Sequence, residues 1–204
     1  EERTSRRAYD LLAEGFGPGF NGPLLVAVDT STVADQELSV LANTLRQDSG
    51  VAFVQPPKQS PVGEAATILV FPTTAPQDGE TVELLTRIRG PIFESVLGDD
   101  GIAHVGGVTA SFADVSDRVQ SRLPVFIAGV IALSFVLLML VFRSVLVPVK
   151  AALLNLLSIG AAYGVLVMVF QWGWGQGLIG LHESVPIVSF VPMFMFAVLF
   201  GLSM

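Results

Sequence analysis

The chain has 204 residues, no cysteine and a formal net charge of −7. Its 51% of hydrophobic residues and its mean hydropathy of +0.65 exclude a disordered chain, which combines low hydrophobicity with high charge. A pI near 4.7 argues against nucleic-acid binding, because proteins that bind nucleic acids carry a basic surface. The lack of cysteine excludes disulfide bonds, thiolate metal sites and thiol nucleophiles.

The charged residues, which make up 14% of the chain, are distributed unevenly. Only three of them, Arg143, Lys150 and Glu183, follow Arg122. We therefore expect the chain before Leu123 to face water and the chain after it to lie in a membrane.

The water-facing part begins with a helical lead-in over residues 1–20, which ends in the glycine-rich segment GPGFNGP. Four short apolar runs then predict strands, and two segments with apolar residues at helical spacing predict helices. The strands are expected at 24–29, 51–55, 66–71 and 102–107, and the helices at 34–48 and 80–97.

The apolar face of the first of these helices is predicted to contain Leu38, Leu41 and Leu45. The second helix is expected to align a longer set of apolar residues and to be kinked or split at Gly90–Pro91, because proline interrupts the hydrogen-bond ladder. Its expected apolar residues are Val82, Leu85, Ile88, Ile92 and Val96.

The resulting order, β-α-β-β-α-β, is the split βαβ pattern of ferredoxin-like domains. We therefore predict an α+β extracytoplasmic, ferredoxin-like domain over residues 21–109, followed by a bundle of transmembrane helices. A connecting helix is expected over 110–122, with Ser111 and Asp114 as a capping box. Only Pro124 separates this helix from the membrane, so motion could pass along a nearly continuous helix.

Three apolar segments predict membrane spans at about 123–142, 150–170 and 185–204. The first is an uncharged run of 20 residues, and a helix of that length covers about 30 Å, the thickness of the bilayer core. The chain does not begin with Met, and Met204 lies inside the third run, so we expect an internal piece of a longer membrane protein.

The short basic loop between the first two spans indicates the cytoplasmic side, which leaves residues 1–122 outside. Arg118 and Arg122 also place two positive charges on the outer flank, which works against this orientation.

Motifs for catalysis or metal binding are weak in this sequence. The segment 175–180 matches G-x-G-x-x-G but follows a span instead of a strand, and His182–Glu183 lacks the second histidine of H-E-x-x-H. His104 is interpreted as structural, Asp99–Asp100 as a turn, and Asp114 with Asp117 as a solvated helix face. We expect no enzyme activity, no metal and no cofactor.

The second span contains the residues that invite a functional interpretation. Gly160 and Gly164 form a small-xxx-small pattern that predicts close helix packing, with Ser158 nearby. Asn155 needs a polar partner or a water-lined path within the membrane. The spans contain no central carboxylate, so residues that couple transport to protons must lie elsewhere.

Several stretches resemble the MMPL (membrane protein large) family of the RND transporter superfamily. They are GGVTASFADVSDRV, the run from Pro124 to Gly175 with its FRS-x-x-x-P-x-K-A motif, and the terminal FGLSM. The resemblance implies two similar halves, each with a large extracytoplasmic porter insertion, and places this chain in the second half. It also implies an Asp-Tyr pair of the proton relay just after Met204, with Gly201 and Ser203 as its neighbours.

The function implied by the resemblance is export of lipids or hydrophobic compounds, driven by the proton-motive force across a bacterial plasma membrane. The implied partners are membrane lipids, the remainder of the same polypeptide, a hydrophobic or lipid substrate and another copy of the protein, but not nucleic acid. An alternative is a non-transporting, membrane-anchored sensor or assembly protein with an outer ferredoxin-like domain.

Overall fold

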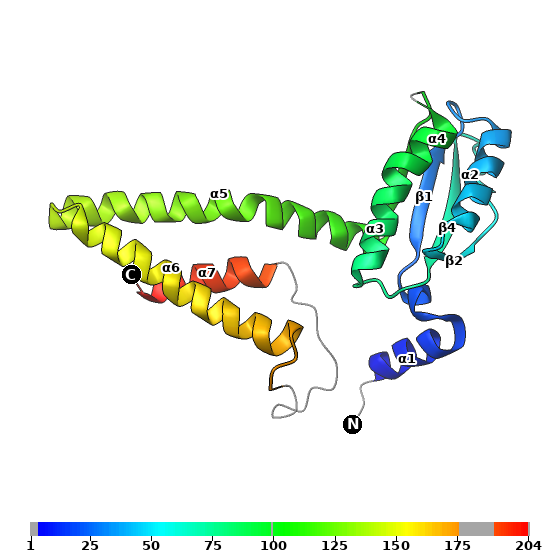
Figure 1. Cartoon of the computed structure of the whole chain (residues 1–204). Helices are drawn as coiled ribbons and strands as arrows, with labels where there is room; N and C mark the ends of the chain where they lie inside the picture. Colours follow the sequence, from blue (N-terminus) through cyan, green and yellow to red (C-terminus); the bar gives the residue numbers. More distant parts are fainter. Residues whose placement is uncertain (1–3, 99, 176–189, 204) are drawn as a thin grey trace. The chain divides into compact units, whose positions relative to one another are not determined.

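The computed structural model describes residues 4–98, 100–175 and 190–203 (Figure 1). The chain divides into two compact units, Glu1–Asp114 and Val115–Met204. The domain boundaries expected near residues 20, 109 and 122 stay predictions.

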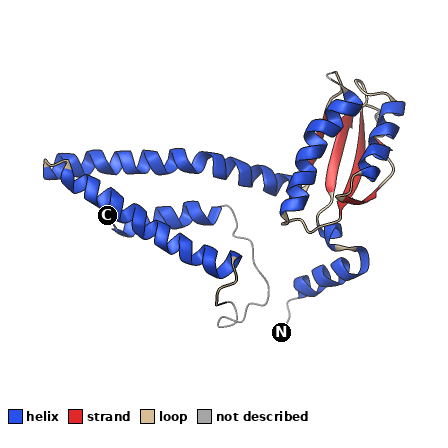
Figure 2. Ribbon diagram, viewed as in Figure 1, coloured by secondary structure: helices blue, strands red, loops and turns tan. Residues whose placement is uncertain are grey.

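The first unit contains an antiparallel sheet, drawn in red in Figure 2. Its four main strands lie in the order β2-β4-β1-β5, and a short fifth strand, β3, pairs with β4. The strands are β1 (Leu24–Asp29), β2 (Val51–Val54), β3 (Lys58–Gln59), β4 (Ala65–Pro72) and β5 (Ala103–Gly106). The four predicted strands are confirmed, whereas β3 lies between the strands predicted at 51–55 and 66–71, where the sequence analysis placed none.

The predicted helices of this unit are also present. The lead-in forms α1 (Thr4–Phe16) and a 3-10 turn, η1 (Pro18–Asn21), and the first core helix is α2 (Asp35–Gln47). The second core helix is divided as expected, into α3 (Gly79–Arg87), a π turn η2 (Ile88–Ile92) and α4 (Phe93–Leu97). Pro91 lies inside the π turn, because a residue without an N–H cannot continue the regular ladder.

The buried face of this second helix differs from the predicted one at two places. Val82 was expected on the apolar face, but it is 42% exposed. Beyond the turn, Phe93 and Leu97 are buried, whereas Ile92 and Val96 are only partly buried. A π turn contains more residues than an α turn, so it rotates the apolar face of the following helix. The predicted apolar face is thus wrong at Val82, which lies before the π turn, and is shifted after Ile88, where the turn begins.

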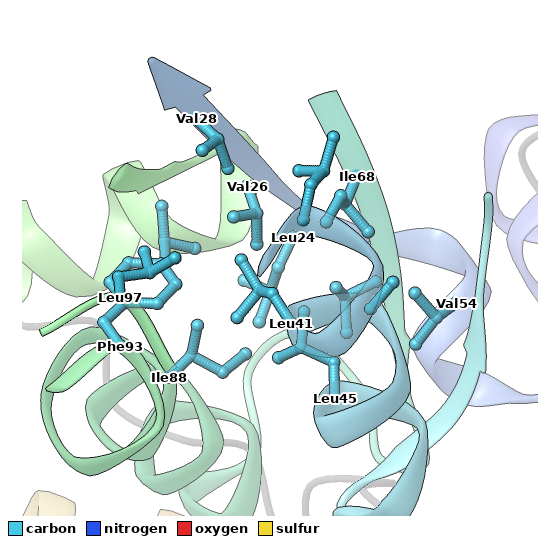
Figure 3. Close-up of a cluster of buried hydrophobic side chains, with 14 of the residues drawn as sticks. Leu24, Val26, Val28, Leu41, Leu45, Val54, Ile68, Ile88, Phe93 and Leu97 are labelled. Atoms are coloured by element: carbon cyan, nitrogen blue, oxygen red, sulfur yellow. The ribbon is translucent and has the colours of Figure 1, made fainter. Parts of the chain in front are cut away.

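One hydrophobic core holds the first unit together, and Figure 3 shows part of it. Alternate side chains of the strands point to one face of the sheet, where both core helices pack against them. Fully buried members from the strands and the helices are Leu24, Val26, Val28, Val54, Ile68, Leu41, Leu45 and Ile88.

The second unit is helical. Helix α5 (Val108–Phe142) runs for 35 residues and continues through Pro124, and α6 (Leu146–Leu166) leads into a π turn, η3 (Val167–Gln171). Among the described residues, two helices are long and apolar enough to cross a membrane, Val108–Phe142 and Leu146–Phe170. A shorter apolar helix, α7 (Phe190–Ser203), follows.

The helix that contains the second predicted span begins before it. The span was expected to start at about Lys150, whereas α6 begins at Leu146 and contains Pro148 in its first turn. A proline is tolerated there because the first N–H groups of a helix have no partner within the helix. For the third predicted span, residues 185–189 and 204 lie outside the described part of the chain.

Candidate functional site

The first turn of α5 is built into the core of the α/β unit. Gly107, just before the helix, has a φ of 100°, and a Cβ there would lie 2.9 Å from the carbonyl oxygen of Pro23, so this position requires glycine. Thr109 is 3% exposed, and its hydroxyl donates to the carbonyl of Gly22 at 3.0 Å. Ala110 is fully buried in the hydrophobic core. The start of α5 is thus fixed by packing and by a buried hydrogen bond.

The second turn of α5 is held by an ion pair. The guanidinium of Arg89, in the π turn η2, donates to both carboxylate oxygens of Asp114, with Nη2 lying 2.9 Å from Oδ2. The same Nη2 also donates to the carbonyl of Val105 in β5 at 2.8 Å. Asp114 raises the pKa of Arg89 through these hydrogen bonds. One arginine therefore joins the π turn, the last strand and α5.

These contacts refine one interpretation made from the sequence and correct another. Asp114 was assigned to a solvated helix face, and its side chain is 55% exposed, but it is also the partner of Arg89. The predicted capping box of Ser111 and Asp114 is wrong. The backbone N–H of Ser111 donates to the carbonyl of Gly107 at 2.9 Å, because α5 begins at Val108 and Ser111 already lies within it.

Among the described residues of the helical unit, Asn155 is a buried polar residue and is only 6% exposed. Helices α6 and α7 pack together. On α7, Phe196 is 1% exposed and stacks on Phe200, with ring centroids 5.2 Å apart. Phe126 of α5 meets Phe196 edge to face at 5.8 Å. A buried amide is costly unless it is hydrogen-bonded, so its position among apolar helices marks a candidate functional position.

The other membrane residues singled out from the sequence do not form a common site in the described part of the chain. Ser158 and Gly160 are exposed, and Gly164 is partly buried. A Cβ at Gly160, Gly164 or Gly201 would meet no atom within 4 Å. Their role in helix packing, and that of Gly201 and Ser203 beside a proton relay, stay predictions.

No group of three or more His, Cys, Asp or Glu residues able to hold a metal ion occurs in the part of the chain that the structure describes. His104 lies on β5 opposite Ala27 and is exposed. Most of the G-x-G-x-x-G match, His182–Glu183 and Asp99 lie outside the described residues.

A folded α/β unit together with two helices long and apolar enough to cross a bilayer is typical of a membrane protein with a domain outside the membrane. The chain belongs to the MMPL family, whose profile matches residues 13–204. The resemblance seen in the sequence is thereby confirmed.

Named relatives include a membrane protein and two exporters. Membrane protein YdfJ of Bacillus subtilis is 37% identical over 208 residues, which covers 100% of this chain and 28% of YdfJ. The mycolic acid-containing lipids exporter MmpL11 of Mycolicibacterium smegmatis is 32% identical, over 98% of this chain and 21% of the exporter. The trehalose monomycolate exporter MmpL3 of the same organism is 34% identical over 48% of this chain and 10% of the exporter. The chain thus spans less than a third of the length of these relatives.

Sequence reasoning missed the ion pair of Arg89 and Asp114. The two residues are 25 positions apart and belong to different elements, so no local spacing rule links them. The available signal was weak: the sequence predicted an irregular helix at Gly90–Pro91, and π turns occur frequently at functional sites.

Proposed function

We propose that this chain is part of a membrane transporter that exports lipids or hydrophobic compounds and is driven by the proton-motive force. The observation that carries the proposal is the match to an exporter of mycolic acid-containing lipids across 98% of the chain. Membership of the MMPL family over residues 13–204 supports it further. The names of these relatives describe export, and we propose that this protein is likewise a transporter and not an enzyme.

The α/β unit is proposed to be a ferredoxin-like porter domain outside the plasma membrane of a bacterium. The antiparallel order β2-β4-β1-β5, with two helices sharing one core with the sheet, supports this assignment. The protein is proposed to be multi-pass, with residues 1–122 extracytoplasmic. The basic residues Arg143 and Lys150, near the junction of α5 and α6, support the cytoplasmic location of that junction.

The proposed mechanism couples protonation to helix packing. A carboxylate elsewhere in the full-length polypeptide gains and loses a proton, and the membrane helices alternate between two arrangements. Asn155, which is buried on α6, is proposed to respond to this change. Helix α5 extends without interruption from the α/β unit into the apolar segment and is the proposed mechanical link. Membrane lipids, the rest of the polypeptide and a lipid substrate are the proposed partners.

The second candidate is a membrane-anchored sensor or assembly protein that transports nothing. The two functions differ in what the cell loses when the gene is deleted. We expect deletion to leave a lipid inside the cell that normally reaches the outer surface, and the full-length gene to restore its export. Export should stop within minutes when a protonophore collapses the proton gradient. Unchanged surface lipids in the deletion strain would favour the sensor.

A further inference from the structure

The ion pair between the α/β unit and α5 suggests a role beyond holding the fold. We propose that Arg89 is a positioning residue, which holds the second turn of α5 on the α/β unit so that movement of the π turn and movement of the helix are coupled. The inference rests on the proposed transport function. It follows from the three hydrogen bonds that one guanidinium makes to two different elements.

The ion pair adds a polar contact to the second turn of α5. The buried contacts of Thr109 and Ala110 hold the first turn, and Ala113 in the second turn is partly buried against the hydrophobic core. Apolar contacts are non-directional, so packing alone sets no angle for this turn. Asp114 is the last residue of the α/β unit, and its paired bonds to Arg89 fix the second turn in both distance and angle.

The chemistry of the pair suits this role. Arginine presents a planar fork of donors that matches a carboxylate in both distance and angle, whereas lysine is a point charge. The third bond, to the carbonyl of Val105, ties the guanidinium to β5. The arginine itself stands in the π turn beside Gly90–Pro91, an irregular segment that departs from ordinary helical geometry. Movement of this segment would therefore be transmitted to α5 through Arg89.

A second pair on the same helix provides a matched control. Arg87 donates to both carboxylate oxygens of Asp48, at 3.0 and 2.8 Å. This pair joins α3 to the residue that follows α2 and includes no residue of α5. Its carboxylate is more buried than that of Asp114, with 13% of the side chain exposed against 55%. Loss of the control pair should therefore cost at least as much stability as loss of the proposed one.

The test uses the full-length protein, purified and reconstituted into lipid vesicles. The variants are Arg89→Gln, Asp114→Asn and the control Arg87→Gln, compared at equal amounts of folded protein. One arm measures the rate of hydrogen exchange of the backbone amides near Asp114. Loss of the ion pair between Arg89 and Asp114 should accelerate this exchange about fivefold. The other arm measures proton-driven transport of a fluorescent phospholipid over a range of lipid concentrations.

We expect Arg89→Gln and Asp114→Asn to reduce the maximal transport rate about fivefold or more while leaving the half-saturating lipid concentration unchanged. Arg87→Gln should leave both transport parameters and the exchange near Asp114 unchanged. The maximal transport rate of Arg89→Lys should lie between those of Arg89→Gln and the wild type, because an ammonium group cannot reproduce the paired bonds of the guanidinium.

Equal rates for Arg89→Gln and the wild type, or equal losses in Arg89→Gln and Arg87→Gln, would overturn the positioning role. A wild-type protein that moves no lipid would overturn the proposed function and the coupling with it. In that case the exchange arm still decides whether Arg89 fixes α5, so the two failures are distinguishable.

Discussion

Insertion of two glycines between Val119 and Gln120 is expected to abolish transport by the full-length protein. The insertion lies in α5, between the ion pair of Asp114 and the apolar segment. Two glycines in a helix interior cost about 2 kcal/mol relative to alanines. Two extra residues also rotate everything downstream by about 200° and advance it by about 3 Å. The core of the α/β unit does not include Val119, so folding and membrane insertion should be retained.

Matched variants separate the two effects of the insertion. Substitution of Val119 and Gln120 by glycine weakens the helix without changing its register, and substitution of both by alanine changes neither. The alanine variant should transport normally, whereas the double-glycine variant should be slowed. The assay is lipid transport in vesicles, with thermal unfolding in detergent as the measure of folding. Normal transport by the two-glycine insertion would refute the reasoning that α5 is a mechanical link.

Three further predictions concern stability, topology and the buried amide. Asp48→Asn should destabilise the α/β unit by about 1–2 kcal/mol at neutral pH, measured by denaturant unfolding. Arg87 holds the pKa of Asp48 below its ordinary value of 3.8, so the stability from this pair is present above that pH and is lost as the pH falls through the folded pKa. Asp48→Asn should therefore unfold with a flatter pH dependence between neutral and strongly acidic conditions, and an unchanged slope would contradict the assignment. For topology, Ser111→Cys should react with a membrane-impermeant maleimide in intact cells, and Ser144→Cys should react only after lysis. The chain has no cysteine of its own and so contributes no background labelling. The reverse labelling pattern would overturn the proposed orientation. Asn155→Leu should insert normally, with a stability change within about 1 kcal/mol, but should lower transport, and full transport would remove Asn155 from the mechanism.

The elements of the α/β unit could be predicted because their signals are local. The run Leu24–Asp29 is short, apolar and bounded by turn residues, and it forms the central strand β1. Leu38, Leu41 and Leu45 recur at helical spacing, and all three are buried. Gly90–Pro91 signalled an interruption because proline lacks a donor, and the structure places a π turn there.

What the sequence could not supply depends on geometry or on contacts over long distances. The rotation of the apolar face after Ile88 follows from the π turn, and a proline alone does not specify that kind of turn. The strand β3 consists of Lys58 and Gln59, which are polar and exposed, and it exists only because β4 offers an edge. The bond between Arg89 and Asp114 requires β5 and α5 to be in place before the two side chains can meet.

The most direct test of the account is proton-driven lipid transport by the full-length protein in sealed vesicles. A pH gradient should drive transfer of a fluorescent lipid from one leaflet or vesicle to an acceptor. The account predicts transfer that requires the gradient, stops on addition of a protonophore and is lost in the two-glycine insertion. Equal transfer with and without the gradient, or none from correctly folded protein, would contradict it.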